Sequence, residues 1–357
     1  MDEIYKSRIC KLRCLLGEEN RDAMLITSRA NCRYLCGFTG SNGYLLVTHE
    51  TLLLFTDSRY LLQAERECLD TNVVLLSQRH RSLADSLMGC GAKELVFEFH
   101  DISHKTYTDI MSVLDGLVRL IPEKYVIEKL RLVKQSEEIK YIEKAVEIAD
   151  EAMSTVGNLL KSGMTELDVA NKLERLMQDL GSESLAFDII VGVGENSAMP
   201  HHSPTHRVIA NGDMVVIDMG AVYMGYRSDL TRTFQVGELT EKFKEIYSLV
   251  LKSQLAVEER VQYGMKGSEV DAIARNVISE GGYGDFFSHG LGHGVGLEVH
   301  EKPMLTKNSD ESVEIGSVFT VEPGIYLPGW GGVRLEDMMV MESKSARLLT
   351  NSSKYDF

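Results

Sequence analysis

The second half of this chain repeats a pattern of helix starts and acidic residues at an offset of a little over one hundred residues. Gly163-Met-Thr165-Glu-Leu-Asp168 is similar to Gly264-Met-Lys-Gly-Ser268-Glu-Val-Asp271, and both contain Ser/Thr-x-x-Asp, a capping signature of a helix start. Four acidic residues on strand-like segments form two pairs, 104 and 107 residues apart: Asp218 with Glu322, and Asp229 with Glu336. We therefore expect two similar α/β halves that face each other, with four carboxylates on a common axis.

A glycine-rich run with one histidine lies between these acidic pairs. In Gly290-Leu-Gly-His293-Gly-Val-Gly, glycine at every second position lets the backbone approach another group closely. One imidazole with several carboxylates is a hard, oxygen-rich ligand set that suits Mn, Co, Fe or Zn. The run and the carboxylates together indicate a hydrolase with paired metals.

The spacing within the first acidic pair predicts a hairpin. Met224-Gly225 can form its two-residue turn, and the resulting register places Asp218 opposite Thr231, with Asp229 on the same face one pair along. Such diagonal neighbours are close enough to share metals. Carboxylates so close together are tolerated only around cations. The second pair has a longer connection, Pro323–Gly332, so we predict no register for it.

Length and composition limit the function classes. A chain of 357 residues is expected to form two domains, and a net charge of −15 argues against a nucleic-acid partner. No apolar run reaches about 18 residues, so we expect no membrane span. Met1–Tyr5 lack the basic and hydrophobic regions of a signal peptide, and we therefore expect a cytoplasmic protein.

The first third alternates strand and helix patterns and predicts an α/β domain of roughly 120 residues. We interpret Asn31–Ser41 as a glycine-punctuated loop and place the domain boundary at Ile121-Pro122-Glu123, where proline breaks the pattern. Neither a Gly-x-Gly-x-x-Gly motif nor a P-loop opens a helix here, so we expect a covering or dimerising role and no nucleotide site.

All six cysteines lie in the first quarter of the chain. Cys10 and Cys14, and Cys32 and Cys36, are each four apart, so one alternative is a four-thiolate zinc site. The spacing is not the usual two-residue one and both pairs lie among apolar residues, which favours free buried cysteines in a reducing compartment.

With these motifs the chain resembles the M24 metallopeptidases of the pita-bread fold, within them the Xaa-Pro dipeptidase and aminopeptidase P branch. The resemblance covers nearly the whole length. It implies an α/β (α+β) fold, with a creatinase-like α/β domain at residues 1–122 and a pseudo-twofold pita-bread catalytic domain at 123–357. It also implies a homodimer and a metallo-exopeptidase that cleaves between an N-terminal residue and proline, in Xaa-Pro dipeptides or short peptides.

The resemblance assigns the site residues one by one. Two divalent ions are implied, with Mn favoured and Co, Zn or Fe as alternatives; Asp229 and Glu336 bridge them, Asp218 holds one, and His293 and Glu322 hold the other. The implied catalytic residues follow from the same resemblance: His201 from Met199-Pro-His-His202, His300, His289, Arg334, and Glu322 as proton shuttle.

Three alternatives stay open. A methionine-aminopeptidase-like enzyme would share the five ligands, although such enzymes mostly lack the N-terminal domain. A non-catalytic pita-bread binding protein is disfavoured because all five ligands are present. Dipeptidase and aminopeptidase P activities differ at the far side of the substrate site, which the sequence does not show.

Overall fold

The computed structural model describes residues 2–76 and 80–355, which form two compact units that divide between Arg131 and Leu132. The boundary that we predicted at residue 122 falls inside strand β6 (Arg119–Glu123), where Pro122 pairs with Phe97 of β5 (Glu94–Glu98). β6 is the last strand of its sheet, and an edge strand tolerates a proline because one side of it needs no ladder hydrogen bonds. The proline therefore marks an edge strand and not the end of the domain's pattern.

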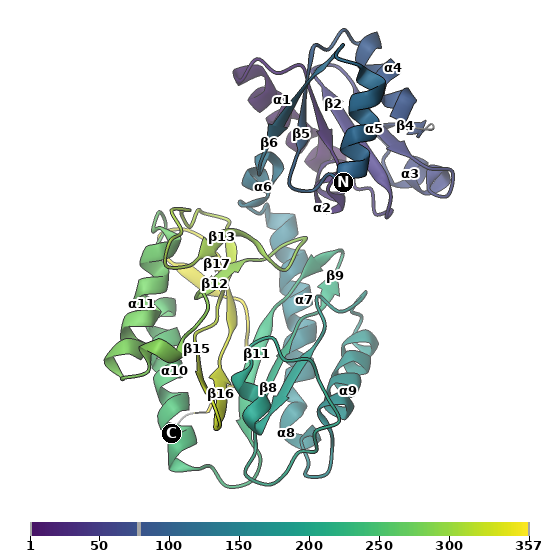
Figure 1. Ribbon diagram of the computed structural model, residues 1–357. Coiled ribbons are helices and arrows are strands. Elements are labelled where there is room, and N and C mark those ends of the chain that lie inside the picture. The colour runs from purple at the N-terminus through teal and green to yellow at the C-terminus, as the bar shows by residue number, and fades with distance from the viewer. Residues whose placement is uncertain (1, 77–79, 356–357) are drawn as a thin grey trace. The chain divides into compact units, whose positions relative to one another are not determined.

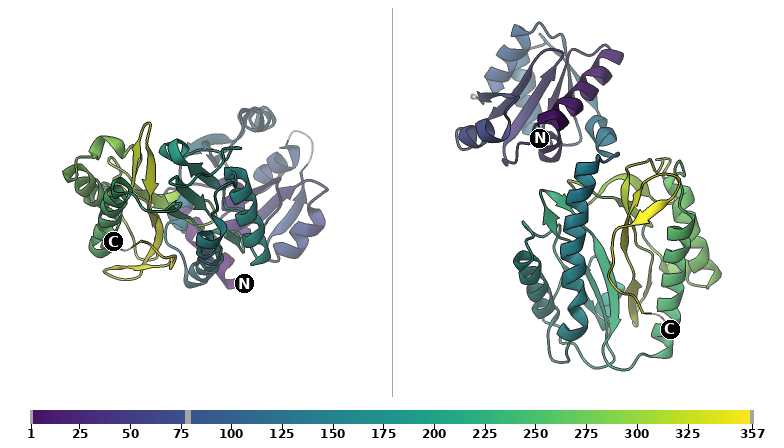
Figure 2. Two further views of the ribbon diagram at one scale, coloured as in Figure 1. Left: turned by 90° about the horizontal axis from the view of Figure 1, so that it is seen from below. Right: turned by 180° about the vertical axis from the view of Figure 1, so that it is seen from behind.

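The first unit is a six-stranded mixed sheet with helices on both faces. The strand order is β4-β3-β2-β1-β5-β6, and the remaining strands are β1 (Ala23–Ile26), β2 (Gly43–Thr48), β3 (Leu52–Thr56) and β4 (Asn72–Leu75). Figures 1 and 2 show α4 and α5 on one face and α1 on the other. The helices are α1 (Asp2–Glu18), α2 (Arg29–Cys36), α3 (Leu61–Glu67), α4 (Arg81–Gly89), α5 (His104–Leu114) and α6 (Val126–Arg131).

One expectation for this unit is wrong, and another is correct only in part. The segment interpreted as a loop begins with helix α2, which Ser28 caps by accepting the Asn31 N–H and which Gly37 ends in the left-handed region at φ 83°. Gly37 is therefore a helix C-cap. All six cysteines are free, as expected, and Cys32, Cys36 and Cys68 are buried, but Cys10, Cys14 and Cys90 are exposed. Within the part of the chain that the structure describes, no cysteines are grouped as metal ligands.

The second unit consists of two halves with matching strand neighbours, as the repeat predicts. In the first half the order is β11-β8-β7, and in the second half β17-β14-β12 form the centre of a five-stranded sheet, β13-β12-β14-β17-β18. Figures 1 and 2 show the strands of both halves in the middle, with helices α7 and α9 outside one half and α10 and α11 outside the other.

The elements of this unit have the following bounds. The helices are α7 (Ser136–Ser154), α8 (Val156–Leu159), α9 (Glu166–Asp179), α10 (Glu241–Arg260) and α11 (Gly267–Glu280), with 3₁₀ turns η2 (Gly194–Ala198) and η3 (Gly284–Phe286). The strands are β7 (Ile190–Val193), β8 (Met214–Met219), β9 (Val222–Tyr223), β10 (Tyr226–Arg227), β11 (Leu230–Gln235), β12 (Gly292–Gly294), β13 (Glu301–Leu305), β14 (Val318–Val321), β15 (Gly324–Leu327), β16 (Gly331–Arg334), β17 (Asp337–Met341) and β18 (Ala346–Leu348).

The two predicted helix caps turn out differently. Thr165 caps α9 and forms a reciprocal capping box with Asp168, as the motif predicts. Helix α11 instead begins two residues earlier than the motif suggests, and the Glu269 carboxylate accepts the Lys266 N–H. Asp271 is buried and accepts the N–H of Leu291 and two bonds from Arg275, so it ties the helix to the glycine-rich run.

The predicted hairpin register is confirmed. β8 and β11 pair with Asp218 opposite Thr231. At the turn, Met224 and Gly225 have φ values of 49° and 79°, as a two-residue turn with both central residues in the left-handed region requires. Because the register is set by this turn, Asp218 and the residues before Leu230 emerge at the same end of the strand pair.

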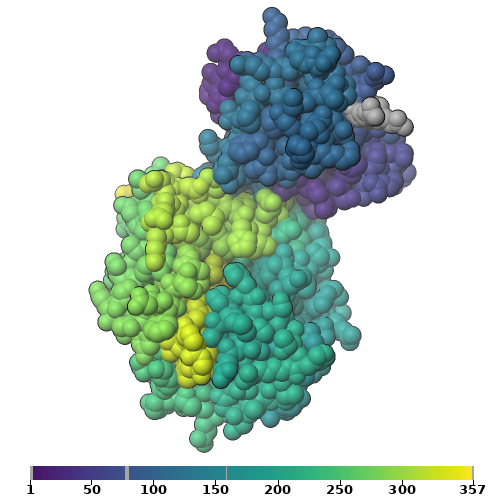
Figure 3. Space-filling view, viewed as in Figure 1, coloured from purple at the N-terminus to yellow at the C-terminus, as the bar shows by residue number. Residues whose placement is uncertain are grey.

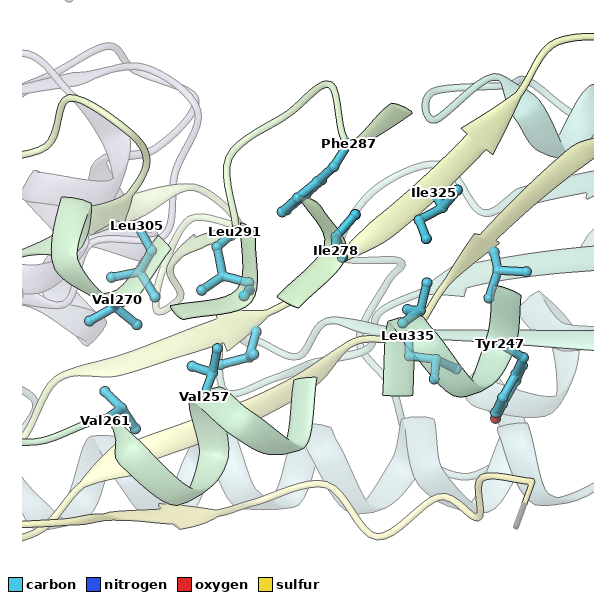
Figure 4. Close-up of a cluster of buried hydrophobic side chains, with 14 of the residues drawn as sticks. Tyr247, Val257, Val261, Val270, Ile278, Phe287, Leu291, Leu305, Ile325 and Leu335 are labelled. Atoms are coloured by element: carbon cyan, nitrogen blue, oxygen red, sulfur yellow. The ribbon is translucent and has the colours of Figure 1, made fainter. Parts of the chain in front are cut away.

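A large apolar cluster supports the strands of the second half. Figure 4 shows side chains of α10 and α11, among them Tyr247, Val257 and Ile278, packed with Ile325 and Leu335 from the strand segments. Each such side chain contributes about 1.5–3 kcal/mol when it is fully buried. The cluster therefore holds rigidly the segments on which Glu322 and Glu336 lie.

Candidate metal centre and active site

One pocket of about 440 Å³ gathers every predicted site residue. Figure 3 shows the face of the second unit hollowed where residues of its first half (teal) meet those of its second half (green), with yellow strand residues between them. The pocket is lined by all nine predicted residues: His201, Asp218, Asp229, His289, His293, His300, Glu322, Arg334 and Glu336. Residues up to 135 positions apart in the sequence thus meet at one place.

Strand ends position the acidic residues. Asp218 lies near the end of β8, and Asp229 comes immediately before β11. In the second half Glu322 directly follows β14 and Glu336 directly precedes β17, the equivalent places in the equivalent strands. The repeat therefore brings two matching pairs of carboxylates to the centre of the unit.

His293 completes this group from β12. Its Nδ1 lies 3.1 Å from the carbonyl oxygen of Gly294, which can only accept, so Nδ1 carries the hydrogen and the Nε2 lone pair is directed elsewhere. Nε2 lies 3.3 Å from Glu322 Oε1 and 3.7 Å from Asp229 Oδ2. An N–H donated to a backbone carbonyl is the usual support of a metal-binding histidine.

The atoms lie close enough for shared coordination. One ligand atom each of Asp229, His293 and Glu336 lies within 4.8 Å of the others. Two threonines orient the carboxylates: Thr231 Oγ1 donates to Glu336 Oε2 at 2.7 Å, and Thr320 Oγ1 lies 3.3 Å from Glu322 Oε1. Such outer hydrogen bonds fix the direction in which a carboxylate presents its free oxygen.

The carboxylates of the cluster repel one another, which favours the binding of cations between them. Burial and the charge of Glu336 raise the pKa of Asp229 well above its ordinary value. Burial and the charge of Glu322 do the same to the pKa of Glu336. The buried Oδ1 of Asp218 has no hydrogen-bond partner among the described residues. A buried oxygen that lacks a hydrogen-bond donor, beside carboxylates that repel one another, fits the ligand set of a divalent-metal centre.

Arg334 is fully engaged beside this cluster. Its Nη2 donates to Asp218 Oδ2 at 2.6 Å, and Nε donates to Thr231 Oγ1 at 3.1 Å. Its Nη1 lies 3.2 Å from the Pro200 carbonyl oxygen and 3.1 Å from the Tyr326 hydroxyl. Arg334 thus connects one carboxylate of the centre to the loop that carries His201.

The three remaining histidines have different surroundings. His289 Nδ1 lies 2.7 Å from the Gly290 carbonyl and therefore carries the hydrogen, so Nε2 accepts from the Tyr326 hydroxyl at 2.8 Å. Burial lowers the pKa values of His289 and His300, which keeps both rings neutral at neutral pH. The ring of His300 lies 4.3 Å from that of His293, centroid to centroid. His201 is exposed in the pocket.

The motif analysis missed several residues that support the site. Thr231 and Thr320 lie two residues from Asp229 and Glu322, and side chains two apart share one face of a strand. That spacing could have identified them. No local signal pointed to Tyr326 or to Glu166, because partners such as His289 and His202 are distant in the sequence.

Two family models match this chain and together cover most of it. Residues 140–343 match the model of metallopeptidase family M24, and residues 8–133 match that of the creatinase/prolidase N-terminal domain. The chain therefore belongs to metallopeptidase family M24. Among the described residues, no helix is long and apolar enough to cross a membrane.

Three relatives cover almost the entire chain. An Xaa-Pro dipeptidase of Pyrococcus horikoshii is 36% identical over 99% of both sequences. The structure of an Xaa-Pro dipeptidase from Bacillus anthracis superposes with a TM-score of 0.95 at 39% identity, over 98% of this chain and 99% of the other. An X-Pro aminopeptidase from Thermotoga maritima superposes at 0.91 with 37% identity and the same coverage. The protein is a metallopeptidase with the prolidase type of domain organisation.

Proposed function

We propose that this protein hydrolyses the bond between an N-terminal residue and proline, with two divalent metal ions per chain. The observation that carries the proposal is the pocket in which four carboxylates, three of them buried and Glu322 half-buried, converge with the Nε2 lone pair of His293. The relatives named as Xaa-Pro peptidases supply the substrate class. Manganese and a homodimer complete the proposal and rest on the family resemblance alone.

The ligand roles follow the resemblance and the donor geometry. Asp229 and Glu336 would bridge the two ions, Asp218 would complete one site through its unpartnered Oδ1, and His293 and Glu322 would complete the other. Bound divalent ions would supply Lewis-acid polarisation of the scissile carbonyl and a water of lowered pKa. Thr231, Thr320 and Arg334 hold the carboxylates for this task.

The remaining groups would move or hold protons. His300 is neutral and next to His293, so a ring N–H is available to the oxygen on which charge develops. Glu322 would accept a proton from the attacking water and pass it on, and His201 would donate near the leaving nitrogen of proline. Both ring nitrogens of His289 already have hydrogen-bond partners. We therefore propose that His289 orients Tyr326 and does not itself transfer a proton.

The apolar wall of the pocket suits the substrate. Phe187, Ile190, Val299 and Met304 line it together with the histidines. An Xaa-Pro bond offers no N–H to a protease, and its ring is rigid, so an apolar surface is the natural way to recognise it. The surrounding carboxylates attract a substrate's amino group and favour cleavage next to the N-terminus.

The decisive experiment combines metal analysis with substrate profiling. We expect purified protein to bind about two Mn²⁺ per chain and to hydrolyse Ala-Pro but not Ala-Ala. Glu336→Gln should lose at least one ion and nearly all activity, because it removes a proposed bridging charge. Glu342→Gln, an exposed carboxylate that pairs with Arg347, is the matched control. Full activity with Glu336→Gln, or activity without bound metal, would contradict the proposal.

A second candidate is an aminopeptidase that accepts longer chains. The X-Pro aminopeptidase of Thermotoga maritima is about as similar to this chain as the dipeptidase of Bacillus anthracis, which favours neither activity. Comparing kcat/KM for Ala-Pro with that for Ala-Pro-Ala separates them. A dipeptidase should lose most of its activity on the tripeptide.

A further inference from the structure

A buried carboxylate at the start of helix α9 gathers five hydrogen-bond donors from one loop. Glu166 is the first residue of α9, and its side chain is fully buried. Its Oε1 accepts from the Val193 N–H and the Asn196 amide, each at 2.9 Å. Its Oε2 accepts from His202 Nε2 and the Thr205 N–H, each at 2.9 Å, and from Thr205 Oγ1 at 2.6 Å. Glu166 thus closes the loop of residues 193–205 at both of its ends.

This loop carries His201, which has no anchor of its own. Among the residues that the structure describes, none hydrogen-bonds to the His201 imidazole. Its position therefore depends on its backbone, which is held through both neighbours. The Pro200 carbonyl accepts from Arg334, and His202 donates to Glu166. The two anchors lie directly on either side of His201.

The other half of the unit shows that the helix start itself does not require this carboxylate. Glu166 and Gly267 are the first residues of α9 and α11 and occupy equivalent positions in the two halves. The backbone N–H of Glu166 donates to the Arg207 carbonyl, and that of Gly267 donates to the Glu311 carbonyl. A Cβ at Gly267 would collide with the Met304 carbonyl, so no side chain fits there. The carboxylate is present only in the half whose loop carries His201.

We propose that Glu166 is a positioning residue that sets the place of His201 in the active site by holding His202, Thr205 and the start of the loop. The proposal rests on the proposed function, in which His201 acts on the substrate. Its physical basis is that a carboxylate only accepts hydrogen bonds and can satisfy several donors at once.

A glutamine cannot replace this group. Whichever way its amide turns, an NH₂ would face the backbone N–H of Val193 or of Thr205, and that buried donor would lose its partner. Burial opposes the charge of Glu166, but the bonds from His202, Thr205 and Asn196 outweigh it and hold its pKa below the ordinary value. The charged form is therefore the one that organises the loop.

The test is a double-mutant cycle on the full-length enzyme with Mn²⁺ bound. We expect Glu166→Gln to lower kcat for Ala-Pro by about 10- to 100-fold, the scale for displacing a reacting group by about 1 Å. Bound Mn²⁺ should remain unchanged. In a His201→Ala background the same change should lower kcat less than about 3-fold, because the group that it positions is gone. Asp168→Asn, in the capping box of the same helix turn, is the control and should leave kcat unchanged.

Two further measurements make the outcome decisive. Hydrogen exchange of residues 193–205 should accelerate in Glu166→Gln and not in Asp168→Asn, and this readout does not depend on the substrate. If Glu166→Gln does not fold, Thr205→Val, which removes one donor, should show the same non-additivity with a smaller loss. Equal losses of kcat with and without His201, or unchanged exchange of the loop, would overturn the proposal. A wild-type protein inactive on Ala-Pro would instead contradict the proposed function and leave the exchange result valid.

Discussion

At the residue scale, the site depends on side chains that touch the proposed ligands but are not among the residues that line the pocket. Thr231 donates to Glu336 and accepts from Arg334 Nε, so one hydroxyl aligns a carboxylate and a guanidinium together. In the other half, Thr320 Oγ1 accepts the backbone N–H of His293 and donates to Glu322. Without these hydroxyls the carboxylates would be free to turn.

Thr231→Val tests this support. Valine has nearly the same shape but cannot hold Glu336 Oε2, so the affinity for Mn²⁺ should fall by about 10- to 100-fold. Calorimetric titration of metal-free protein measures the affinity directly. Ser253→Ala, which removes another buried hydroxyl, one that donates to the Ala274 carbonyl, should leave the Mn²⁺ affinity unchanged. Equal affinity in Thr231→Val would show that Glu336 needs no such support.

His201 and His300, which lie outside the proposed ligand set, have a different expected signature. His201→Ala and His300→Ala should each keep both metal ions and lower kcat by roughly 10²-fold, the scale for losing a general acid or an oxyanion donor. Metal content and steady-state kinetics on the same preparation provide the check. Loss of metal from either variant would mean that the histidine is a ligand and that the assignment is wrong.

At the scale of secondary-structure elements, tight turns and strand ends determine which side chains meet. The β9–β10 turn keeps Asp218 and Asp229 at one end of the β8–β11 pair. Gly225 is at φ 79° and donates its N–H to Glu183, so this position combines an unusual backbone conformation with a specific bond. The turn is therefore a sensitive point of the first half.

Two substitutions at this turn should have opposite effects on stability. Gly225→Ala should lower the free energy of unfolding by about 1–2 kcal/mol, because a Cβ is strained at this φ. Met224→Asn should raise it by a few tenths of a kcal/mol, because Asn-Gly is the preferred sequence of such a turn. Thermal unfolding of both variants with saturating Mn²⁺ measures the difference. A destabilised Met224→Asn would argue that the methionine side chain matters more than the backbone.

At the scale of the whole molecule, all the predicted site residues lie in one of the two units. Every predicted site residue lies after Leu132, and the first unit has its own sheet and its own core. The four carboxylates at the centre repel one another, so the second unit should be more stable with its cations than without them. We therefore expect metal binding to stabilise the second unit and not the first.

Chelation should reveal this coupling. At a metal concentration 100 times the Kd, each bound ion stabilises the folded state by about 2.7 kcal/mol, so removing both ions should lower the Tm of the second unit by about 10 to 20 °C. Hydrogen exchange should rise in β8, β11, β12, β14 and β17 after EDTA treatment and stay constant in β1 to β6. Re-addition of Mn²⁺ is the control. A uniform change over both units would contradict a metal site confined to the second.

Much of the architecture was predictable because it follows from local and periodic features. The offset between equivalent acidic residues predicts the two halves, and Met224-Gly225 predicts the pairing of Asp218 with Thr231, since a two-residue turn leaves only one register. The sequence analysis named all nine of these pocket residues because most of them lie in short strings that are recognisable along the chain, such as Gly290–His300 and Gly331–Asp337. These features are encoded within a few residues or by a repeat.

Other features arise only from packing between distant segments. Pro122 breaks a local pattern yet belongs to a strand, because being at the edge of a sheet is a property of the whole sheet. Asp271 matches a capping motif yet binds the N–H of Leu291, since the tertiary fold offers it a buried donor. Glu166 gains its partners from a loop up to 39 residues away. A carboxylate's role is set by the donors that surround it, and only the folded chain brings them there.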